Sequence, residues 1–319
     1  MTELLPADTR MGRVSLDVAD LDALTRFYRD VLLLDVLAQR PSEVDLGRSA
    51  ETLVTLRHRP ELPKGERRSA GLFHTALLHA DRASLAATMA SVAMHTPHLY
   101  TGAADHLVSQ AFYLDDPEGN GVELYWDRPR AEWSWQQGGV VMDTLPLDPN
   151  GFIGAHLTDV GRELLSTAPD RRGVLDGLQG TVGHVHLKVG DAAIAKHFYT
   201  DLLGFELTAE APGAVFVSAG GYHHHMAMNT WRSAGAGLRA PALGLGRVDI
   251  ALPDADQVAR AAVRLRVHGV QLRDDGVAGE LDDPWGNLVR LSSCSSERDP
   301  ALTRPSLISS GLPSTGGLN

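Results

Sequence analysis

The chain has 319 residues, a length that suffices for roughly two domains that each bury a core. It carries 29 Lys+Arg and 40 Asp+Glu, and this net charge of −11 disfavours a nucleic acid or an anionic membrane as a partner. Cys294 is the only cysteine, which excludes intramolecular disulfides and cysteine-based metal clusters and fits a reducing compartment. Metal chemistry must therefore come from the 14 histidines and the carboxylates.

The predicted elements follow a strand, helix, strands order that occurs four times along the chain. In the first copy, residues 14–18 alternate as a strand, residues 21–33 have apolar side chains at helical spacing, and short β-like segments follow. The same order restarts at Gly71 and then twice more. The four modules span about 11–59, 71–128, 181–232 and 246–293.

Two pairs of similar segments indicate an internal duplication. Six residues between Val18 and Leu32 recur between Val189 and Leu203, each 171 positions later. The segment LDDPEGNGVEL at 114–124 recurs 167 positions later as LDDPWGNLVRL. Because the two offsets are so close, one unit of two modules has been duplicated with a small change in length. We expect the following organisation: an N-terminal domain over 11–128, a connector over 129–180 with a helix near 159–166, a C-terminal domain over 181–293, and a flexible tail over 294–319.

Two further features concern the location of the protein. No apolar run approaches the ~18 residues of a membrane span. The first residues also lack the basic and apolar segments of a secretory signal. We therefore expect a soluble, cytoplasmic protein.

Glu123 is a candidate metal ligand in the predicted strand 121–126. By strand alternation, Glu123 and Tyr125 share the face opposite their apolar neighbours. The duplicated segment has Arg290 at this position, so an ordinary surface residue explains Glu123 alone equally well. His74, in the first strand of the same module, is a natural partner because a buried carboxylate needs a counter-ion or a metal. Taken alone, His74 is more typical of a hydrogen-bonded structural histidine.

The third module adds two histidines in the segment VGHVHLKV. His184 and His186 project from one face of a strand that corresponds to the strand of His74. One of them would complete a set of two histidines and one carboxylate. Such a set leaves positions on the metal open for a substrate and dioxygen.

The segment GGYHHHMAMN places three consecutive histidines in a predicted apolar strand. Alternation predicts that His223 and His225 face one side and His224 the other, so all three cannot bind one ion. Tyr113, ten residues before Glu123, could donate a hydrogen bond to a metal-bound oxygen. A strand tyrosine is more often a core residue whose hydroxyl is satisfied elsewhere.

These features together resemble the vicinal oxygen chelate superfamily of glyoxalases, bleomycin resistance proteins and dioxygenases. The resemblance is carried by the fourfold repeat and by VGHVHLKVGDAAIAKHFYTDLLGFEL, GGYHHHMAMN and FYLDDPEGNGVELYWDRP, and it covers about residues 11–293. It is greatest to the type I extradiol ring-cleaving dioxygenases of the catechol 2,3-dioxygenase kind. The implied fold is α+β, with four βαβββ modules in two tandem vicinal-oxygen-chelate domains. The implied reaction opens catechol-type aromatics with Fe(II), or Mn(II), and dioxygen, so a small aromatic diol and O2 are the expected partners.

The resemblance assigns the metal ligands to His74, Glu123 and His184, with His186 as the second choice. In the well-known two-domain members, the histidine of the third module acts with ligands from the fourth. Here the fourth module has GRVDIAL, without a histidine, and Arg290 where a glutamate is expected. A cation at this position would repel a metal ion. The second and third modules are the pair that supplies a full ligand set, so we expect one iron site at the junction of the two halves.

Further roles follow from the same resemblance. The acid/base histidine corresponds to His224, with His223 and His225 as close competitors. Tyr113 corresponds to the active-site tyrosine, and His106 lies near the place of a further substrate-contacting histidine. The first alternative is a glyoxalase-like metal-dependent isomerase or transferase, in which His225 would be a fourth ligand. The second alternative is a non-catalytic protein that binds an aromatic ligand. The metal triad argues against this alternative. The choice of catechol and the formation of a homo-oligomer stay open.

Overall fold

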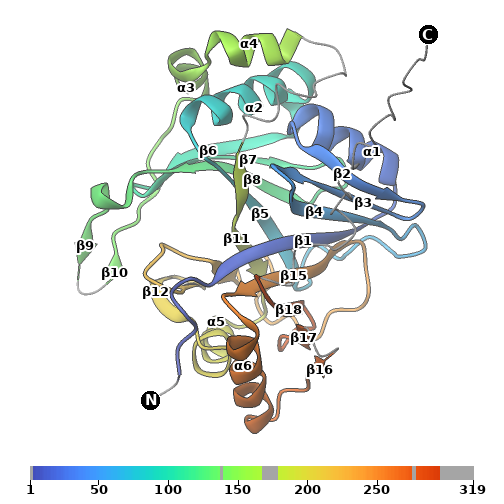
Figure 1. Ribbon diagram of the computed structural model, residues 1–319, viewed down its shortest axis with the longest axis vertical. Coiled ribbons are helices and arrows are strands. Elements are labelled where there is room, and N and C mark those ends of the chain that lie inside the picture. The colour runs from blue at the N-terminus through green and yellow to red at the C-terminus, as the bar shows by residue number, and fades with distance from the viewer. Residues whose placement is uncertain (1–2, 137–138, 167–178, 275–277, 295–319) are drawn as a thin grey trace, which may run out of the picture.

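Two eight-stranded sheets dominate the structure, and each combines strands from both halves of the chain (Figure 1). The computed structural model describes residues 3–136, 139–166, 179–274 and 278–294. Sheet A has the strand order β16-β17-β18-β15-β1-β4-β3-β2. Its strands are β1 (Arg10–Val18), β2 (Asp35–Arg40), β3 (Glu43–Arg48), β4 (Glu51–His58), β15 (Gly244–Leu252), β16 (Arg273–Asp274), β17 (Ala278–Asp282) and β18 (Leu288–Ser293).

Sheet B has the same architecture, with the order β12-β13-β14-β11-β5-β8-β7-β6. Its strands are β5 (Gly71–His79), β6 (Tyr100–Asp105), β7 (Ser109–Asp115), β8 (Gly121–Asp127), β11 (Gly180–Lys188), β12 (Glu206–Ala211), β13 (Ala214–Ser218) and β14 (Met226–Asn229). The strands β9 (Trp135–Gln136) and β10 (Gly139–Val140) form a separate two-stranded sheet, and β10 contacts β12. The predicted α+β class with four strand, helix, strands modules is confirmed.

Each sheet is built from two modules that come from different halves of the chain. Antiparallel pairing of β1 with β15 joins the first module to the fourth, and antiparallel pairing of β5 with β11 joins the second to the third. In the second junction, the Cα atoms of His186 and His74 are direct partners. The expected pairing of the second module with the third is therefore confirmed by the sheet topology. The residue limits of the two tandem domains stay a prediction.

Helices cover the outer faces of the sheets, and aspartates begin most of them. In Figure 1, α2, α3 and α4 gather at one end of the molecule and α5 and α6 at the other. The bounds are α1 (Leu21–Arg26), α2 (Arg82–His95), α3 (Pro149–His156), α4 (Asp159–Ser166), α5 (Ala192–Lys196) and α6 (Ala255–Val267). The carboxylate of Asp81 accepts a hydrogen bond from the backbone N–H of Ser84 at the start of α2, as expected of an N-cap. The expected helix of the connector is α4.

The turn between β7 and β8 sets the position of Glu123. The carboxylate of Asp116 accepts hydrogen bonds from the backbone N–H groups of Glu118 and Asn120, and Gly119 supplies a positive φ of 90°. Asp283 repeats this turn between β17 and β18. The duplicated motif is thus turn chemistry, and it places Glu123 in the first half of β8.

The prediction that the three consecutive histidines, residues 223–225, lie in a strand is wrong. They do not lie in a strand, because β14 begins at Met226 and residues 223–225 belong to the loop before it. Gly220 and Gly221 have positive φ values of 63° and 66°, which turn the chain there. Simple alternation therefore does not govern the directions of these three side chains.

Two other expectations concern the ends and the location of the chain. The expected flexible tail lies outside the described residues, apart from Cys294. Among the helices of the described part, none combines the length and the apolar character required to cross a membrane.

Candidate metal centre and its cavity

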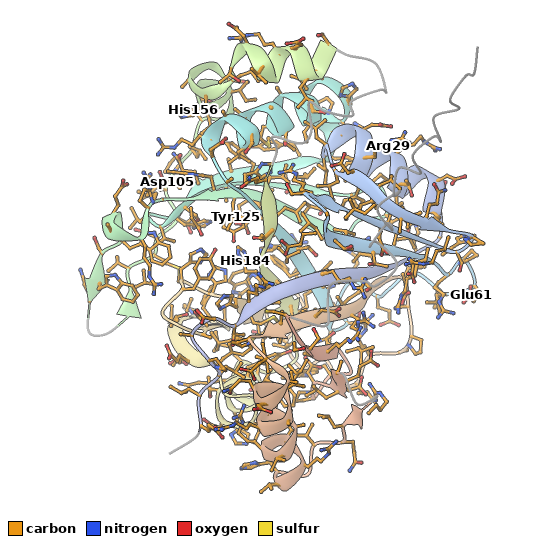
Figure 2. The ribbon with its side chains drawn as sticks, viewed as in Figure 1. Arg29, Glu61, Asp105, Tyr125, His156 and His184 are labelled. Atoms are coloured by element: carbon orange, nitrogen blue, oxygen red, sulfur yellow. The ribbon has the colours of Figure 1, made fainter. Side chains whose placement is uncertain are left out.

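A cavity of about 1720 Å³ lies against sheet B, and strands from both halves of the chain line it. We call it the sheet B cavity. Seven of the predicted site residues line its wall: His74, His106, Tyr113, Glu123, His184, His186 and His224. Figure 2 shows His184 and Tyr125 in the interior of the molecule, whereas Arg29, Glu61 and His156 lie at the periphery.

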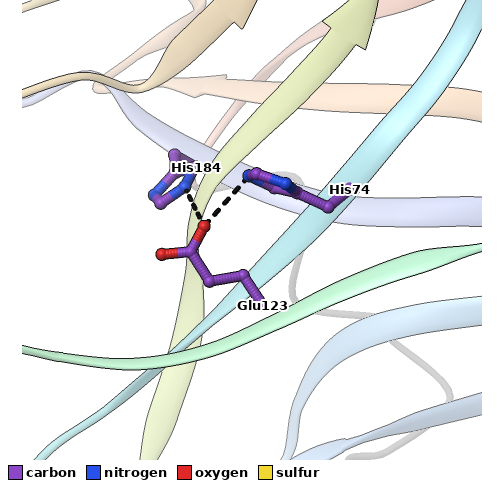
Figure 3. A group of neighbouring side chains, drawn as sticks. All are labelled: His74, Glu123 and His184. Atoms are coloured by element: carbon purple, nitrogen blue, oxygen red, sulfur yellow. Dashed lines mark hydrogen bonds and ion pairs between the residues drawn. The ribbon is translucent and has the colours of Figure 1, made fainter. Parts of the chain in front are cut away.

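His74, Glu123 and His184 form a compact group at this wall (Figure 3). The Nε2 atoms of His74 and His184 lie 3.0 and 3.1 Å from the same Glu123 oxygen, Oε2. One ligand atom from each residue lies within 4.8 Å of the others, and all three side chains are buried. The strands explain this approach, since β11 and β8 flank β5 on its two sides.

The charge state of this group suits a cation. Burial alone would raise the pKa of Glu123, but the charge and hydrogen bond of His184, with the neighbouring His74, lower it well below its ordinary value. Burial lowers the pKa of His184, and this outweighs the opposing influence of Glu123. An ionised carboxylate and a neutral imidazole are the forms that bind a metal ion.

The unsatisfied polar atoms of the group also fit a metal ion. His184 Nδ1 is buried and has no hydrogen-bond partner in the described structure, and His74 Nε2, 3.0 Å from Glu123 Oε2, lacks a well-directed hydrogen bond. Buried nitrogen atoms without a partner are rare because desolvation is costly. Two imidazoles and one carboxylate are the donor set of non-haem Fe(II) sites with open positions. The residues present therefore fit such an ion.

Tyr113 and His106 form a second pair in the same cavity. The Tyr113 hydroxyl lies 2.7 Å from His106 Nε2, and His106 Nδ1 lies 2.8 Å from the Asp143 carbonyl oxygen. The carbonyl can only accept, so His106 Nδ1 carries the proton and Nε2 accepts from the tyrosine. Burial, followed by the charge of Glu123, raises the pKa of Tyr113 well above 10. Tyr113 is therefore a neutral phenol beside the candidate metal centre.

His224 is linked to a carboxylate through His223. His223 Nε2 lies 3.0 Å from Asp127 Oδ1, and His223 Nδ1 lies 2.8 Å from His224 Nδ1. In the tautomer that donates Nε2–H to the carboxylate, His223 has a bare Nδ1, which accepts from His224 Nδ1–H. This network leaves His224 Nε2 without a proton. Tyr222 donates to the other oxygen of Asp127 at 2.7 Å.

Two predicted candidates lie outside these groups. His186 lines the cavity, but its Nε2 lies 2.9 Å from the amide of Asn229, and it is not part of the three-residue group. His225 does not line the cavity. Its Nδ1 accepts a hydrogen bond from the backbone N–H of Ala219 at 3.2 Å. The side chain of His225 therefore lies in a position that does not suit a fourth ligand.

Sheet A carries arginines where sheet B carries the candidate ligands. Arg13, Arg247 and Arg290 occupy the repeat positions of His184, His74 and Glu123. Arg247 and Arg13 pair with Asp249 at 2.6 and 3.3 Å. In sheet A these ion pairs occupy the place that the candidate ligands occupy in sheet B, and the expectation that the fourth module holds no iron site stays a prediction.

Sequence reasoning missed Asp127 and Lys188. Asp127 ends β8 four residues after Glu123, so strand alternation places it on the Glu123 face. Lys188 continues the alternating series His184, His186 on β11. In both cases the alternation of the strand was the available signal.

Comparison with known proteins agrees with this architecture. The family model of the Glyoxalase/Bleomycin resistance protein/Dioxygenase superfamily matches residues 10–124 and 181–291. A catechol-2,3-dioxygenase of Bacillus subtilis (strain 168) is 35% identical over 289 residues, which cover 87% of this chain and 94% of the relative.

Solved structures share the fold at low sequence identity. A putative dioxygenase from Bacillus subtilis subsp. subtilis str. 168 has a TM-score of 0.62 at 14% identity and covers 92% of this chain and 86% of its own. Glyoxalase I from Zea mays has a TM-score of 0.56 at 17% identity, with coverage of 91% and 94%. The two family-model matches and the relative establish the family, and the chain belongs to the Glyoxalase/Bleomycin resistance protein/Dioxygenase superfamily.

Proposed function

We propose that this protein is an extradiol dioxygenase that opens catechol-type aromatic rings with a metal ion and dioxygen. The observation that carries the proposal is the convergence of His74, Glu123 and His184 in a large cavity. The 35% identical relative named catechol-2,3-dioxygenase supports the same reaction class. Fe(II) is the proposed ion because the donor set is that of non-haem iron sites, and Mn(II) is the alternative.

The bound ion would act as a Lewis acid toward the diol and would offer an open position to dioxygen. His224 would take the proton of a diol hydroxyl at Nε2, the nitrogen that the network leaves bare. Burial, followed by the neighbouring His184 and His223, lowers the pKa of His224 well below 6.5, so the ring is neutral before the diol enters. Asp127 and His223 are positioning residues in this proposal, since they act through His224.

Tyr113 would orient the substrate from the other side. Its phenol keeps its proton because the pKa is raised, so it can donate a hydrogen bond to a substrate oxygen. His106 accepts from Tyr113 in the present arrangement and can exchange this hydrogen bond with the substrate. The pair thus supplies a donor near the candidate metal centre.

The glyoxalase-like alternative is less well supported. It requires a fourth protein ligand, and His225, the predicted candidate, faces Tyr222 and Phe205 and does not line the cavity. The non-catalytic alternative leaves the three converging donors without a role. We therefore give the dioxygenase preference.

Metal content and oxygen uptake test the proposal. The protein is purified without oxygen, loaded with Fe(II), and analysed for bound iron. Oxygen consumption is then recorded with catechol, together with the yellow ring-opened semialdehyde product. The expected result is one iron per chain and oxygen uptake that matches product formation. Iron-loaded and manganese-loaded protein that consume no oxygen with any catechol would refute the proposal.

A further inference from the structure

Lys188 extends the row of cavity-facing residues on β11. His184, His186 and Lys188 follow each other at intervals of two residues, so they share one face of the strand, and all three line the sheet B cavity. At about 3.3 Å per residue, the Cα atom of Lys188 lies roughly 13 Å from that of His184. The lysine therefore belongs to the same cavity but to a different end of it.

The ammonium group of Lys188 has no counter-ion in the described structure. The side chain is half-buried, and it has neither an ion pair nor a hydrogen bond to any residue that the structure describes. The repeat counterpart in sheet A is Asp17, which pairs with Arg57 Nε at 2.8 Å. Burial and the charges of Arg239 and Arg232 lower the pKa of Lys188, as expected of a cation among cations.

Two arginines adjoin this lysine. Gly71 is the Cα partner of Lys188, and a Cβ atom on Gly71 would lie 3.9 Å from the guanidinium carbon of Arg239. Arg239 donates a hydrogen bond of 2.9 Å to the carbonyl oxygen of Leu245, which fixes the guanidinium group. Arg232 is exposed and also lines the cavity.

The nearby carboxylates offset these charges only in part. Glu118 accepts hydrogen bonds from the backbone N–H groups of Ala19 and Asp20 at 2.9 and 2.7 Å. Glu210 pairs with Lys196 at 2.9 Å. Burial raises the pKa of Asp115, and the positive charge of Arg232 partly opposes this rise. Asp283 and Asp17 also act on Arg239, but Tyr199 donates to Asp283 and Arg57 pairs with Asp17. Of the carboxylates that act on Lys188, Arg232 and Arg239, Asp115 is therefore the one without an ion pair or a side-chain hydrogen bond to another described residue.

Aromatic rings lie between this cationic end and the candidate metal centre. The ring of His186 is 4.9 Å from that of Phe73 and 5.5 Å from that of Trp231, and Phe73 and Trp231 are 5.6 Å apart. Phe73 also contacts His74, with ring centroids 5.4 Å apart. Flat apolar walls of this kind suit an aromatic ring.

We infer that the substrate is a catechol with a carboxylate on its ring substituent, whose anionic group binds to Lys188 with Arg232 and Arg239 beside it. The diol would lie at His74, Glu123 and His184, and the ring would lie along Phe73 and Trp231. This assignment rests on the proposed dioxygenase function. It adds a substrate class, because an ammonium without a counter-ion inside a cavity gains a charge-assisted hydrogen bond when a carboxylate enters.

Binding of a matched pair of ligands tests the inference. 3,4-Dihydroxyphenylacetate and 3,4-dihydroxyphenylacetamide have nearly the same shape but differ in charge. Calorimetry on the metal-loaded protein without oxygen gives a Kd for each. The carboxylate is expected to bind at least about tenfold more tightly, since a hydrogen bond to a charged group is worth about a factor of ten or more.

Three variants identify the residue responsible. Lys188→Met should remove most of the difference between the two ligands, whereas Lys188→Arg, which keeps the charge, should retain most of it. Arg162→Met removes one exposed charge from α4, outside the cavity, and should leave the difference unchanged. Equal Kd values in the unmodified protein, or a difference that Lys188→Met does not reduce, would overturn the inference. Oxygen uptake with unsubstituted catechol, which has no anionic group, tests the dioxygenase function separately from this binding result.

Discussion

Glu123 and Arg290 occupy the same place in the two sheets and carry opposite charges. Glu123 lies beside Ala76 in the pairing of β8 with β5, and Arg290 lies beside Asp249 in the equivalent pairing of β18 with β15. One sheet therefore directs a carboxylate toward two histidines, and the other holds a network of arginines and carboxylates. The duplication has produced one site suited to a cation and one that repels it.

Glu123→Gln should abolish stoichiometric metal binding. The amide keeps the shape of the side chain but removes the negative charge that draws a divalent ion to two neutral imidazoles. Metal content after desalting, with circular dichroism as the measure of folding, provides the test. Glu280→Gln in sheet A is the matched control and should keep its metal. A folded Glu123→Gln protein with one bound metal ion per chain would contradict the assignment.

Arg290→Ala should leave turnover nearly unchanged. The residue lies in sheet A, which does not contribute to the sheet B cavity at this position. We expect kcat/KM for catechol within about twofold of the unmodified protein, the usual range for a substitution away from the site. Steady-state oxygen uptake measures this, and a loss of activity with retained folding would indicate a site in the fourth module.

Asp127→Asn should lower kcat with little effect on KM or metal content. The amide no longer fixes the proton on His223 Nε2, so the network ceases to keep His224 Nε2 free of a proton. Loss of such an outer partner typically costs about ten- to hundredfold in activity. Tyr222→Phe, which removes the hydrogen bonds of this hydroxyl to the other Asp127 oxygen and to Tyr125 but leaves the Asp127–His223 contact, is the control and should have a smaller effect. An Asp127→Asn protein with unchanged kcat would argue against the positioning role.

The free energy of unfolding should fall as the pH is lowered below about 6.5. Burial, followed by His223 and His184, lowers the pKa of His225 to about 3, compared with 6.5 in the unfolded chain. Between these values the unfolded chain binds a proton that the folded chain does not, so acid favours unfolding. From pH 7.5 to pH 5 this side chain accounts for a loss of about 2 kcal/mol.

Urea denaturation of the metal-free protein at pH 7.5 and pH 5.0 measures this loss. His225→Asn keeps an acceptor for the Ala219 N–H but cannot take up a proton, so its stability should depend less on pH. Burial lowers the pKa of His186 and His224 as well, so part of the pH dependence remains in this variant. Identical pH dependence in the two proteins would show that His225 does not contribute.

Part of the site could be predicted from local patterns. The offset between the duplicated segments and the alternation of strands indicated four modules, and the types of residue at 74, 123 and 184 indicated metal chemistry. The loop of His223, His224 and His225 was predicted wrongly as a strand, because the positive φ values of Gly220 and Gly221 are not evident from an apolar pattern. Asp127 was missed because its partner, His223, is 96 residues away in the sequence.

The sequence by itself determined the repeated modules, the supply of histidines and carboxylates, and the exclusion of cysteine chemistry, because these depend on residue type and spacing along one chain. The pairing of the second module with the third was expected only because these two modules supply a full ligand set, and the tertiary structure decided the strand pairing and the register. Antiparallel pairing of β5 with β11 brings His74 and His184 to one carboxylate, although they are 110 positions apart, and aligns Lys188 with the same cavity. Strand pairing across so long a separation depends on packing of the whole chain, which no local pattern records.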